Sequence, residues 1–568
     1  VAPSRGLGDV YKRQMLEQGI RPQNILAITF TNKAAQEMRE RVHHLVGAEA
    51  NKLWMYTFHS FGARFLRREI NNHPPFTDKF TIYDSDDSKQ MIKNILKELN
   101  LDDKQYPPRN IQARISAAKN ALQGPESFRA EASGNFYNEK IADVYDLYDK
   151  YMKQNNALDF DDLLFATTKL LADETIRRRW QDHFHYILID EYQDTKELQY
   201  MILGAILKTG KENKAFIVGD PNQSIYGNLG GFPMNKTQLE NVTGLYYDEL
   251  SLSNNYRSSS LLVSYFDYFK TYANKIEATG KTKDYQSVIS YNKTISIEDL
   301  ENEIVRIIQT NIDEYHIFPN EICILAPQWI HLSGLTRNLM ARLPQYSFDG
   351  PGMAPFARDI DNFWYELSRI ILTDSTPGLY IRRLRWASEI VTNLISIGVT
   401  NVDLSAKQIL YICNNILINE QDGLEYLKKF FNAFLDRVNI DINQNKYLKM
   451  HYDAFFDSSK KRIERLKKEG AEFITNIDTF RKVFQQKKGI TISTNHGVKG
   501  AEFDTVIAFG LLDGYVPHFS ELNKEESAKR ILYVIASRAR KNLYLISEQG
   551  RKKYPTQILD RYKYPYNG

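Results

Sequence analysis

The stretch HYILIDEYQDT, residues 185–195, runs from four apolar or aromatic residues directly into two acids, Asp190 and Glu191. A short apolar run of this kind predicts a buried strand, and the carboxyl ends of parallel strands are where α/β folds bind ligands. Asp190 suits the oxygen coordination of Mg²⁺, and Glu191 is placed to orient or activate a water. The alternative is that these acids cap the helix that follows, because acids favour helix N-termini.

Further apolar segments, each followed by turn residues and a helical pattern, lie at residues 24–30, 53–58, 215–220, 322–327, 505–510 and 542–547. Buried strands that alternate with helices predict α/β units with parallel sheets. Residues 80–182 and 373–484 carry apolar residues at helical spacing instead. We therefore expect two α/β domains, each with a helical insertion.

Composition excludes several classes of protein. The 568 residues suffice for about three or four domains, and no apolar run approaches the roughly 18 residues that span a bilayer. Cys323 and Cys413 are too few for a disulfide framework or a cysteine-rich zinc site, which indicates a reducing cytoplasm. A formal charge of +4 is small for this length, so nucleic-acid binding would depend on local patches.

The chain carries eight motifs whose order resembles that of superfamily 1 DNA helicases of the UvrD, Rep and PcrA type. They are AITFTNKAAQEMRERV (27–42), TFHSF (57–61), LDFDDLL (158–164), DEYQDT (190–195), VGDPNQSIYG (218–227), LSNNYRS (252–258), STNHGVKGAEFDTV (493–506) and LYVIASRAR (532–540). An ordered set is far more specific than any single motif. The resemblance implies two RecA-like α/β domains of the P-loop NTPase type with parallel sheets, each interrupted by a helical subdomain.

The resemblance also implies roles in ATP hydrolysis. Asp190 would hold Mg²⁺, Glu191 would activate the attacking water, and Gln223 would sense the γ-phosphate. Arg257 and Arg538 would supply the positive charge that phosphoryl transfer needs. A lone arginine would more often form a surface salt bridge, but these two lie within the motifs NYRS and SRAR.

Two further residues would contact ATP. By resemblance, Tyr256 would stack on the adenine and Glu502 would reach the ribose, while Gln223, Arg257 and Arg538 would contact the phosphates. ATP and Mg²⁺ are therefore the expected cofactors.

DNA binding requires a cationic path with aromatic platforms on which bases stack. The resemblance places Phe30, Asn32, His59, Tyr226 and His496 on that path. From the residues alone, Phe30 and Tyr226 would be taken for core residues that close their strands. The expected partners are single-stranded DNA and junctions between single and double strands, with no membrane.

The domain boundaries follow the motifs. We expect a foreign segment at 1–14, a first RecA-like domain at 15–80 and 183–248 with its insertion at 81–182, and a second at 249–372 and 485–568 with its insertion at 373–484.

The phosphate loop G-x-x-x-x-G-K-[ST] of the family is absent from the sequence, and we expect that the chain is truncated before Met15 and therefore inactive by itself. TGKT (279–282) lacks the first glycine of the loop, and GGFPMNKT (230–237) lacks the second. A phosphate cradle needs successive backbone N–H groups at glycine-permitted angles, followed by a lysine.

Other departures and charge runs have simpler readings. Asn228 and Leu229 stand where the family has an aromatic residue and an arginine, which predicts a weaker grip on DNA. The basic run 460–468, with Arg481, Lys482, Lys487 and Lys488, favours a solvated helix face over a duplex contact. Asp159, Asp161 and Asp162 are expected to cap a helix and not to bind a metal, since a helix places them on different faces.

The sequence thus predicts an ATP-dependent 3′ to 5′ helicase or translocase on single-stranded DNA, acting in repair, replication or recombination. One alternative is a catalytically inactive helicase-like DNA-binding protein, which the missing loop favours and the intact Glu191, Gln223, Arg257 and Arg538 disfavour. A helicase–nuclease fusion would need a further acidic metal centre, for which the 28 residues after Arg540 are too few.

Overall fold

A computed structural model describes residues 19–72, 74–207, 214–227, 230–350, 354–356, 362–396, 398–399, 404–468, 472–484 and 489–568. The expectations about the segment before Met15, about Asn228 and Leu229, and about Lys487 and Lys488 fall outside these residues.

The chain divides into two compact units. One comprises the chain up to Tyr285 together with Pro517–Ser537, and the other comprises Gln286–Val516 with Arg538–Gly568. Residues 249–285 thus group with the first unit. The domain boundaries expected from the motifs stay a prediction, because compactness alone does not define a RecA-like domain.

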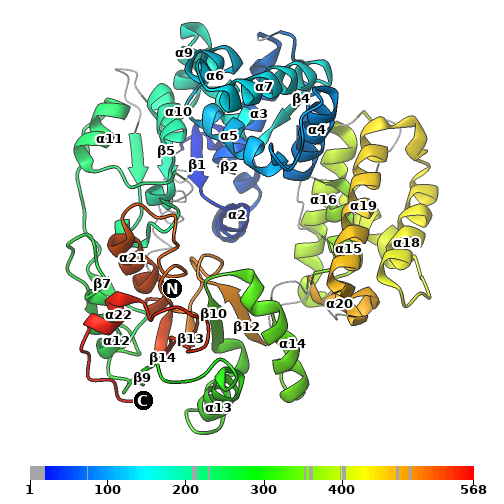
Figure 1. Ribbon diagram of the computed structural model, residues 1–568. Coiled ribbons are helices and arrows are strands. Elements are labelled where there is room, and N and C mark those ends of the chain that lie inside the picture. The colour runs from blue at the N-terminus through cyan, green and yellow to red at the C-terminus, as the bar shows by residue number, and fades with distance from the viewer. Residues whose placement is uncertain are drawn as a thin grey trace. The chain divides into compact units, whose positions relative to one another are not determined.

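The first unit contains a four-stranded sheet in the order β2-β1-β5-β6, in which every pairing is parallel. Its strands are β1 (Ile25–Thr29), β2 (Trp54–Thr57), β5 (Tyr186–Ile189) and β6 (Lys214–Ile217). Its main helices are α2 (Asn32–Val46), α3 (Phe58–Glu69), α10 (Glu197–Leu207) and α11 (Lys236–Thr243). Figure 1 shows β1, β2 and β5 side by side.

Both faces of this sheet are buried, because successive side chains of a strand point to opposite faces. Leu26 and Ile28 belong to the core that includes Phe61 of α3, whereas Ile25 and Ala27 belong to a separate core with α2. The central strand β1 is buried along its whole length, which explains why it reads as a continuous apolar run.

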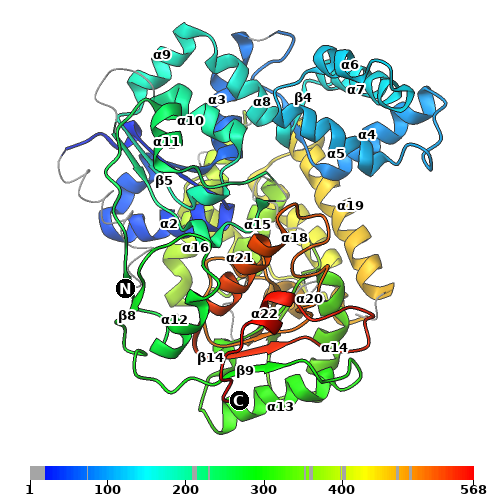
Figure 2. The same ribbon diagram turned by 60° about the vertical axis from the view of Figure 1, so that its left-hand side comes forward.

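A helical region interrupts this domain between β2 and β5. It comprises α4 (Ser85–Glu98), α5 (Pro108–Asn120), α6 (Pro125–Ala132), α7 (Phe136–Gln154), α8 (Phe160–Leu171) and α9 (Glu174–His183), with the short parallel strands β3 (Thr81–Tyr83) and β4 (Ala157–Asp159). In both ribbon views α4 to α7 form one group (Figures 1 and 2). This group has its own core around Ile111 and Tyr148.

The first unit also contains α12 (Ser260–Asp267), α21 (Lys524–Ala536) and the parallel pair β7 (Asn254–Asn255) and β8 (Glu277–Ala278).

The second unit contains a six-stranded parallel sheet in the order β11-β12-β10-β13-β14-β9. The strands are β9 (Ile289–Asn292), β10 (Ile322–Ala326), β11 (Phe348–Asp349), β12 (Ile490–Thr494), β13 (Phe503–Ala508) and β14 (Ala539–Ile546). The helices α13 (Leu300–Asp313) and α14 (Leu332–Arg342) share a core with β10 and β13. The short helix α22 (Gln557–Arg561) lies near the end of the chain.

A second helical region separates β11 from β12. Its helices are α15 (Phe363–Ile371), α16 (Tyr380–Ser396), α17 (Ala406–Asn414), α18 (Gly423–Val438), α19 (Lys446–Lys468) and α20 (Ile477–Lys482). They enclose an aromatic core around Trp364, Phe431 and Phe480. The predicted class is therefore confirmed: two parallel α/β sheets, each with a helical insertion in its chain.

Candidate functional site

The acid pair of the opening stretch lies at the carboxyl end of β5, as predicted. The backbone N–H of Asp190 donates to the carbonyl of Ile28 at 2.9 Å, which continues the strand pairing by one residue. Glu191 adopts a left-handed conformation with φ of 57°, which is uncommon outside glycine, asparagine and aspartate. The chain therefore turns sharply at Glu191, and the two half-buried carboxylates stay at the strand end.

Hydrogen bonds connect this acid pair to the loop after β6. Gln193, which is fully buried, donates from Nε2 to Glu191 Oε2 at 2.6 Å and accepts at Oε1 from the backbone N–H of Asp220 at 3.1 Å. Asp220 Oδ2 then accepts from Gln223 Nε2 at 2.9 Å. Gln193 and Asp220 thus join Glu191 to Gln223. Glu191 is the residue predicted to activate water, and Gln223 is the one predicted to sense phosphate.

Gly219 allows this connection. A Cβ atom at Gly219 would lie 2.1 Å from Gln193 Oε1 and 2.5 Å from a ring carbon of Tyr192. Any side chain at this position would therefore displace the amide that bridges the two loops.

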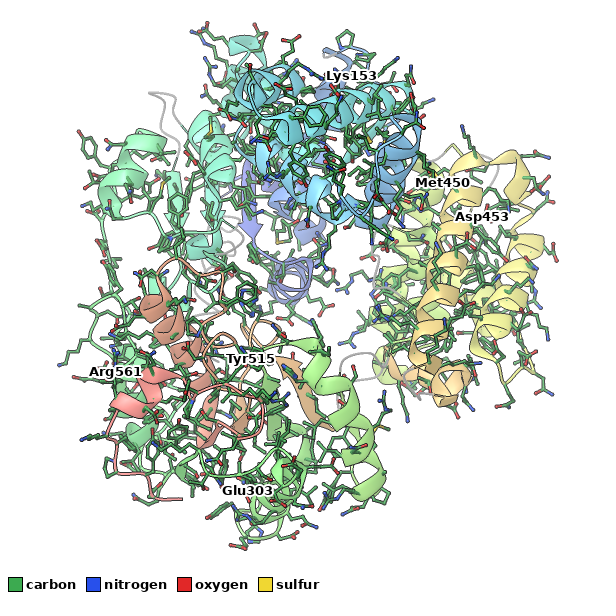
Figure 3. All side chains as sticks on the ribbon, in the orientation of Figure 1. Lys153, Glu303, Met450, Asp453, Tyr515 and Arg561 are labelled. Atoms are coloured by element: carbon green, nitrogen blue, oxygen red, sulfur yellow. The ribbon has the colours of Figure 1, made fainter. Side chains whose placement is uncertain are left out.

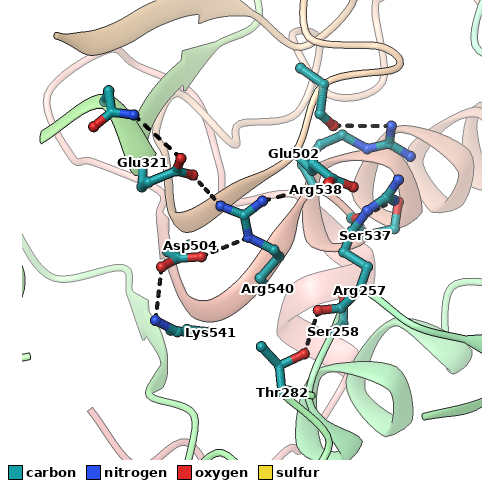
Figure 4. A network of polar contacts seen from close by, with 12 residues as sticks. Arg257, Ser258, Thr282, Glu321, Glu502, Asp504, Ser537, Arg538, Arg540 and Lys541 are labelled. Carbon is teal, nitrogen blue, oxygen red and sulfur yellow. Dashed lines mark hydrogen bonds and ion pairs between the residues drawn. The ribbon is translucent and has the colours of Figure 1, made fainter. Parts of the chain in front are cut away.

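Arg257 is held by three neighbouring groups in the first unit. Its backbone N–H donates to Asn255 Oδ1 at 2.9 Å. Its carbonyl accepts from Thr282 Oγ1 at 2.6 Å, and its guanidinium donates to the carbonyl of Ser537 at 3.0 Å (Figure 4). Ser537 is the C-cap of α21, where the helix dipole favours a cation.

The segment TGKT next to Arg257 serves as a support and does not resemble a phosphate cradle. A Cβ atom at Gly280 would lie 2.1 Å from the carbonyl oxygen of Tyr256, so the two backbones are in close contact. The side chain of Tyr256 is 49% exposed. The segment GGFPMNKT also has a local role, because its residue Asn235 caps α11.

Arg538 and Glu502 both belong to the second unit. Arg538 is 2% exposed, its guanidinium donates to the carbonyl of Ala501 at 3.4 Å, and its own carbonyl accepts from the N–H of Phe503 at 2.9 Å. Glu502 lies 3.5 Å from the guanidinium of Arg540.

Arg540 is the centre of an ionic network that sequence reasoning missed (Figure 4). It pairs with Glu502, with Glu321, and with Asp504 at 2.6 Å. Asp504 also pairs with Lys541 at 2.8 Å. Glu321 lies more than 180 positions before the other acids, so no local pattern in the sequence indicated this network.

Three of the residues predicted to bind DNA line one hollow of about 150 Å³ in the first unit. Phe30 follows β1, and its ring centre lies 4.9 Å from that of Tyr226. His59, in the first turn of α3, also lines the hollow, together with Lys196 and Gly231. Burial and the charge of Lys196 lower the pKa of His59, whereas burial raises the pKa of Tyr226 to about 12. At neutral pH both rings are therefore uncharged.

Asn32 and His496 are placed elsewhere. Asn32 is exposed at the start of α2, and its Oδ1 accepts from Thr57 Oγ1 at 3.3 Å, which connects it to the N-cap of α3. His496 belongs to the second unit, in the turn after β12. The structure thus brings together Phe30, His59 and Tyr226 and leaves the relation of His496 to them a prediction.

Asn222 is a second residue that sequence reasoning missed. Its buried side chain forms a two-point pair with the backbone of Tyr272: Oδ1 accepts from the N–H at 2.7 Å, and Nδ2 donates to the carbonyl at 3.1 Å. Oδ1 also accepts from the N–H of Thr271 at 2.8 Å. Arg530 of α21 donates to Thr271 Oγ1 at 3.3 Å. Asn222 therefore connects two loops. One contains Gln223, and the other is the segment between α12 and β8.

The acids of LDFDDLL cap a helix, as expected. Asp159 is the N-cap of α8 and forms a capping box with Asp162. Between them lies the buried ammonium group of Lys119, 2.6 Å from Asp159 Oδ2 and 2.7 Å from Asp162 Oδ1. Tyr148 donates to Asp159 at 2.9 Å. These interactions show that the acids of this motif have a structural role.

The basic run 460–468 lies at the end of α19. Ile463 and Leu466 are buried, while Lys460, Lys461, Arg465, Lys467 and Lys468 are exposed. Earlier in the helix, Met450 and Asp453 point away from the helical bundle (Figure 3). The helix thus has one apolar face and one solvated face, which is the arrangement expected from its sequence.

No helix within the described ranges is both long and apolar enough to cross a membrane.

Comparisons with known proteins identify the family of the chain. Residues 5–244 match the UvrD/REP helicase N-terminal domain, and residues 406–550 match the UvrD-like helicase C-terminal domain. The chain is 30% identical over 586 residues to the ATP-dependent DNA helicase PcrA of Staphylococcus epidermidis RP62A, covering 94% of this chain and 78% of that protein. It is 29% identical over 596 residues to PcrA of Staphylococcus aureus Mu50, with the same coverage. The chain therefore belongs to the family of UvrD-like DNA helicases.

Proposed function

We propose that this protein is an ATP-dependent helicase that moves 3′ to 5′ along single-stranded DNA and separates strands at junctions with duplex. Its work would be in DNA repair, replication or recombination. The proposal draws on membership of a DNA helicase family and on one observation above all: the chain of hydrogen bonds from Glu191 through Gln193 and Asp220 to Gln223.

This chain of hydrogen bonds suits an ATP-driven motor because it joins two tasks. Glu191 would orient and deprotonate the attacking water, and Gln223 would contact the terminal phosphate. A change at Gln223 on phosphate loss would alter its bond to Asp220 and, through Gln193, the position of Glu191. Asn222, next to Gln223, would pass the same change to the loop at Thr271 and Tyr272.

The residues present are compatible with a magnesium nucleotide. Mg²⁺ is usually held by one or two carboxylates, with phosphates and waters completing the shell, and Asp190 at its strand end would supply one such carboxylate. When bound, the ion would neutralise charge on the phosphates. Arg257 and Arg538 would supply further positive charge, Tyr256 would stack on the adenine, and Glu502 would reach the ribose.

On the DNA side, the proposed contact residues are Phe30, Asn32, His59, Tyr226 and His496. Uncharged aromatic rings around a small hollow favour base stacking that does not depend on sequence. Lys196, at the same hollow, adds the positive charge that attracts the phosphate backbone.

The first experiment is ATP hydrolysis with Mg²⁺, with and without oligothymidine. We expect DNA-stimulated hydrolysis that Glu191→Gln lowers by about 100-fold or more, the usual contribution of a general base, with DNA affinity unchanged. The 568 residues contain no G-x-x-x-x-G-K-[ST], so the chain is assayed beside a version extended with such a loop. Hydrolysis by neither version would contradict the proposal.

Direction is tested separately, by strand displacement from duplexes with a 3′ or a 5′ single-stranded tail. Preference for the 3′ tail is expected, and preference for the 5′ tail would reverse the proposed polarity.

A second candidate is a helicase-like DNA-binding protein that does not hydrolyse ATP. Tight binding of oligothymidine that neither ATP nor Glu191→Gln alters would support it.

A further inference from the structure

Outside the proposed DNA and nucleotide contacts, the first unit carries a row of arginines beside β2, the edge strand of its sheet. Arg64, Arg67 and Arg68 are exposed on α3, whose opposite side is buried through Phe61 and Phe65. Residues three and four positions apart lie on one face of a helix, so these arginines form a single strip.

The arginines alternate with aromatic rings. The guanidinium of Arg64 lies 5.2 Å from the ring centre of Trp54 and 5.4 Å from that of Tyr56. The guanidinium of Arg68 lies 4.8 Å from Trp54 and 5.9 Å from Trp180. These distances are within the range of cation–π attraction.

Arg39 of α2 extends the series, with its guanidinium 5.7 Å from the Tyr56 ring. We call Arg39, Arg64 and Arg68, with Tyr56, Trp54 and Trp180, the arginine ladder.

Carboxylates do not neutralise the ladder. Arg64 donates to the hydroxyl of Tyr56 at 2.6 Å, and Arg39 donates to the carbonyl of Met55 at 2.8 Å. Across the described ranges of the chain, none of the three ladder arginines forms an ion pair. Glu69, the acid of the same helix, is buried and accepts from Trp180 Nε1 at 2.8 Å. The ladder therefore presents uncompensated positive charge.

The geometry points to a ligand with repeated anionic groups. A stacked guanidinium is held flat, and the N–H groups at its edge are positioned for two-point bonding to a phosphate. Trp54 and Trp180 are only 5% and 3% exposed, so bases cannot stack on them as they do on single-strand platforms. Tyr56 is half-buried, and the guanidinium groups of Arg39 and Arg64 lie over its ring, so the ladder offers a ligand mainly guanidinium groups.

We propose that the arginine ladder binds the phosphate backbone of duplex DNA. The inference rests on the proposed DNA substrate and adds a second contact, distinct from the hollow at Phe30 and Tyr226. Duplex is favoured over single strands because the ladder offers charge without stacking, and its binding would not depend on sequence. Another function is open to the same residues, namely protection of the edge strand against pairing with a second chain.

The test compares the salt dependence of binding without nucleotide. The full chain and Arg64→Gln/Arg68→Gln are titrated with KCl on a blunt duplex and on oligothymidine of equal length, with fluorescence anisotropy as the readout. Each phosphate contact contributes about 0.9 to the slope of log K against log[KCl]. We expect the slope for duplex to fall by about 2 and the slope for oligothymidine to stay unchanged.

The matched control is Arg306→Gln/Arg342→Gln, which removes the same formal charge from arginines that are paired with Glu303 and Glu301. If the double variant fails to fold, Arg64→Lys/Arg68→Lys keeps both charges, and the slope for duplex should then persist while affinity falls several-fold.

The outcomes separate the alternatives. A slope for duplex equal to that of the control would overturn the proposal and leave the ladder as edge protection. An equal fall on oligothymidine would assign the ladder to the single-strand path. Duplex binding with the expected slope but no ATP hydrolysis would overturn the proposed function alone, and failure to bind either DNA would overturn both.

Discussion

LDFDDLL and DEYQDT each place acids at the end of a short strand, β4 and β5 respectively, and the structural environments of these acids differ. In LDFDDLL, Asp159 and Asp162 bond to each other's backbone N–H groups and to Lys119. These partners lie within one helical region, and the ammonium group that joins the acids is buried.

In DEYQDT, Glu191 precedes the short helical turn Tyr192–Asp194 and makes no side-chain hydrogen bond that caps it. The conformation at Glu191 turns the chain away from the strand, and Gln193 links Glu191 to the loop after the neighbouring strand β6. Asp190 and Glu191 therefore stay at the edge where the strands end. The difference teaches that the same local pattern has a structural role where a buried cation lies between the acids, whereas at Glu191 a neutral amide connects the acid to a neighbouring loop.

Removing the buried cation should produce the largest effect on stability. Lys119→Met leaves Asp159 and Asp162 buried without their partner, which costs about 3–5 kcal/mol when one member of a buried pair is lost. Chemical denaturation measures the change. Lys169→Met, on the exposed side of α8, serves as control and should change stability by less than about 0.5 kcal/mol. Equal effects would contradict the structural role assigned to Lys119.

The loop after β6, to which Gln193 of DEYQDT is bonded, should show the next-largest effect on stability. Asn222→Ala removes three hydrogen bonds to the backbone of Thr271 and Tyr272, and each lost bond costs about 0.5–1.5 kcal/mol. We expect the free energy of unfolding of the first unit to fall by about 2 kcal/mol or more. Asn222→Asp keeps both acceptor bonds and should cost less. If the two variants cost the same, the acceptor bonds of Asn222 do not hold this loop.

The hollow at Phe30 and Tyr226 should show an effect that is confined to DNA binding. Phe30→Ala should weaken oligothymidine binding by about 1–3 kcal/mol, the usual contribution of one base–aromatic stack. Phe318→Ala removes a ring that is 73% exposed in the second unit and should leave the affinity unchanged. Anisotropy titrations at one salt concentration measure both variants. Unchanged affinity in Phe30→Ala would assign this ring to the core.

The dependence of stability on pH should show a separate effect, which is measured as a slope and not as a single difference in free energy. Burial and the neighbouring charge of Asp159 raise the pKa of Asp162 to about 7, from an ordinary value of 3.8 for an aspartate side chain. Between these values the folded chain holds a proton that the unfolded chain has lost, so this group stabilises the fold at low pH and the contribution disappears as the pH rises through about 7.

Asp162 contributes at most about 1.4 kcal/mol per pH unit to the slope of the unfolding free energy against pH. Asp162→Asn should remove it, and unfolding between pH 5 and 7, roughly the window that linkage defines, measures the change. An unaltered slope in the variant would mean that Asp162 is ionised throughout this window.

The sequence by itself determined the fold class and the motif order. β1, β5, β10 and β13 were predictable because they are buried central strands, and burial on both faces writes a continuous apolar run into the chain. Strand β12 was missed although it lies inside its sheet, because the polar residues of ITIST interrupt its apolar run. Strands β9 and β11 were also missed. They lie at the edges of their sheet, and β11 is only two residues long. The capping role of Asp159 was also predictable, because a cap depends on neighbours three residues away.

Only the tertiary structure decided which distant side chains meet. Lys119 reaches Asp159 across 40 positions, Gln193 reaches Asp220 across 27, and Asn222 reaches Tyr272 across 50. None of these partners follows a helical or strand period, so periodicity cannot reveal them. The arginine ladder has the same origin: α3, β2 and α9 bring Arg68, Trp54 and Trp180 together. Local sequence specifies elements, whereas the packing of those elements determines where charge is neutralised and where it remains available to a ligand.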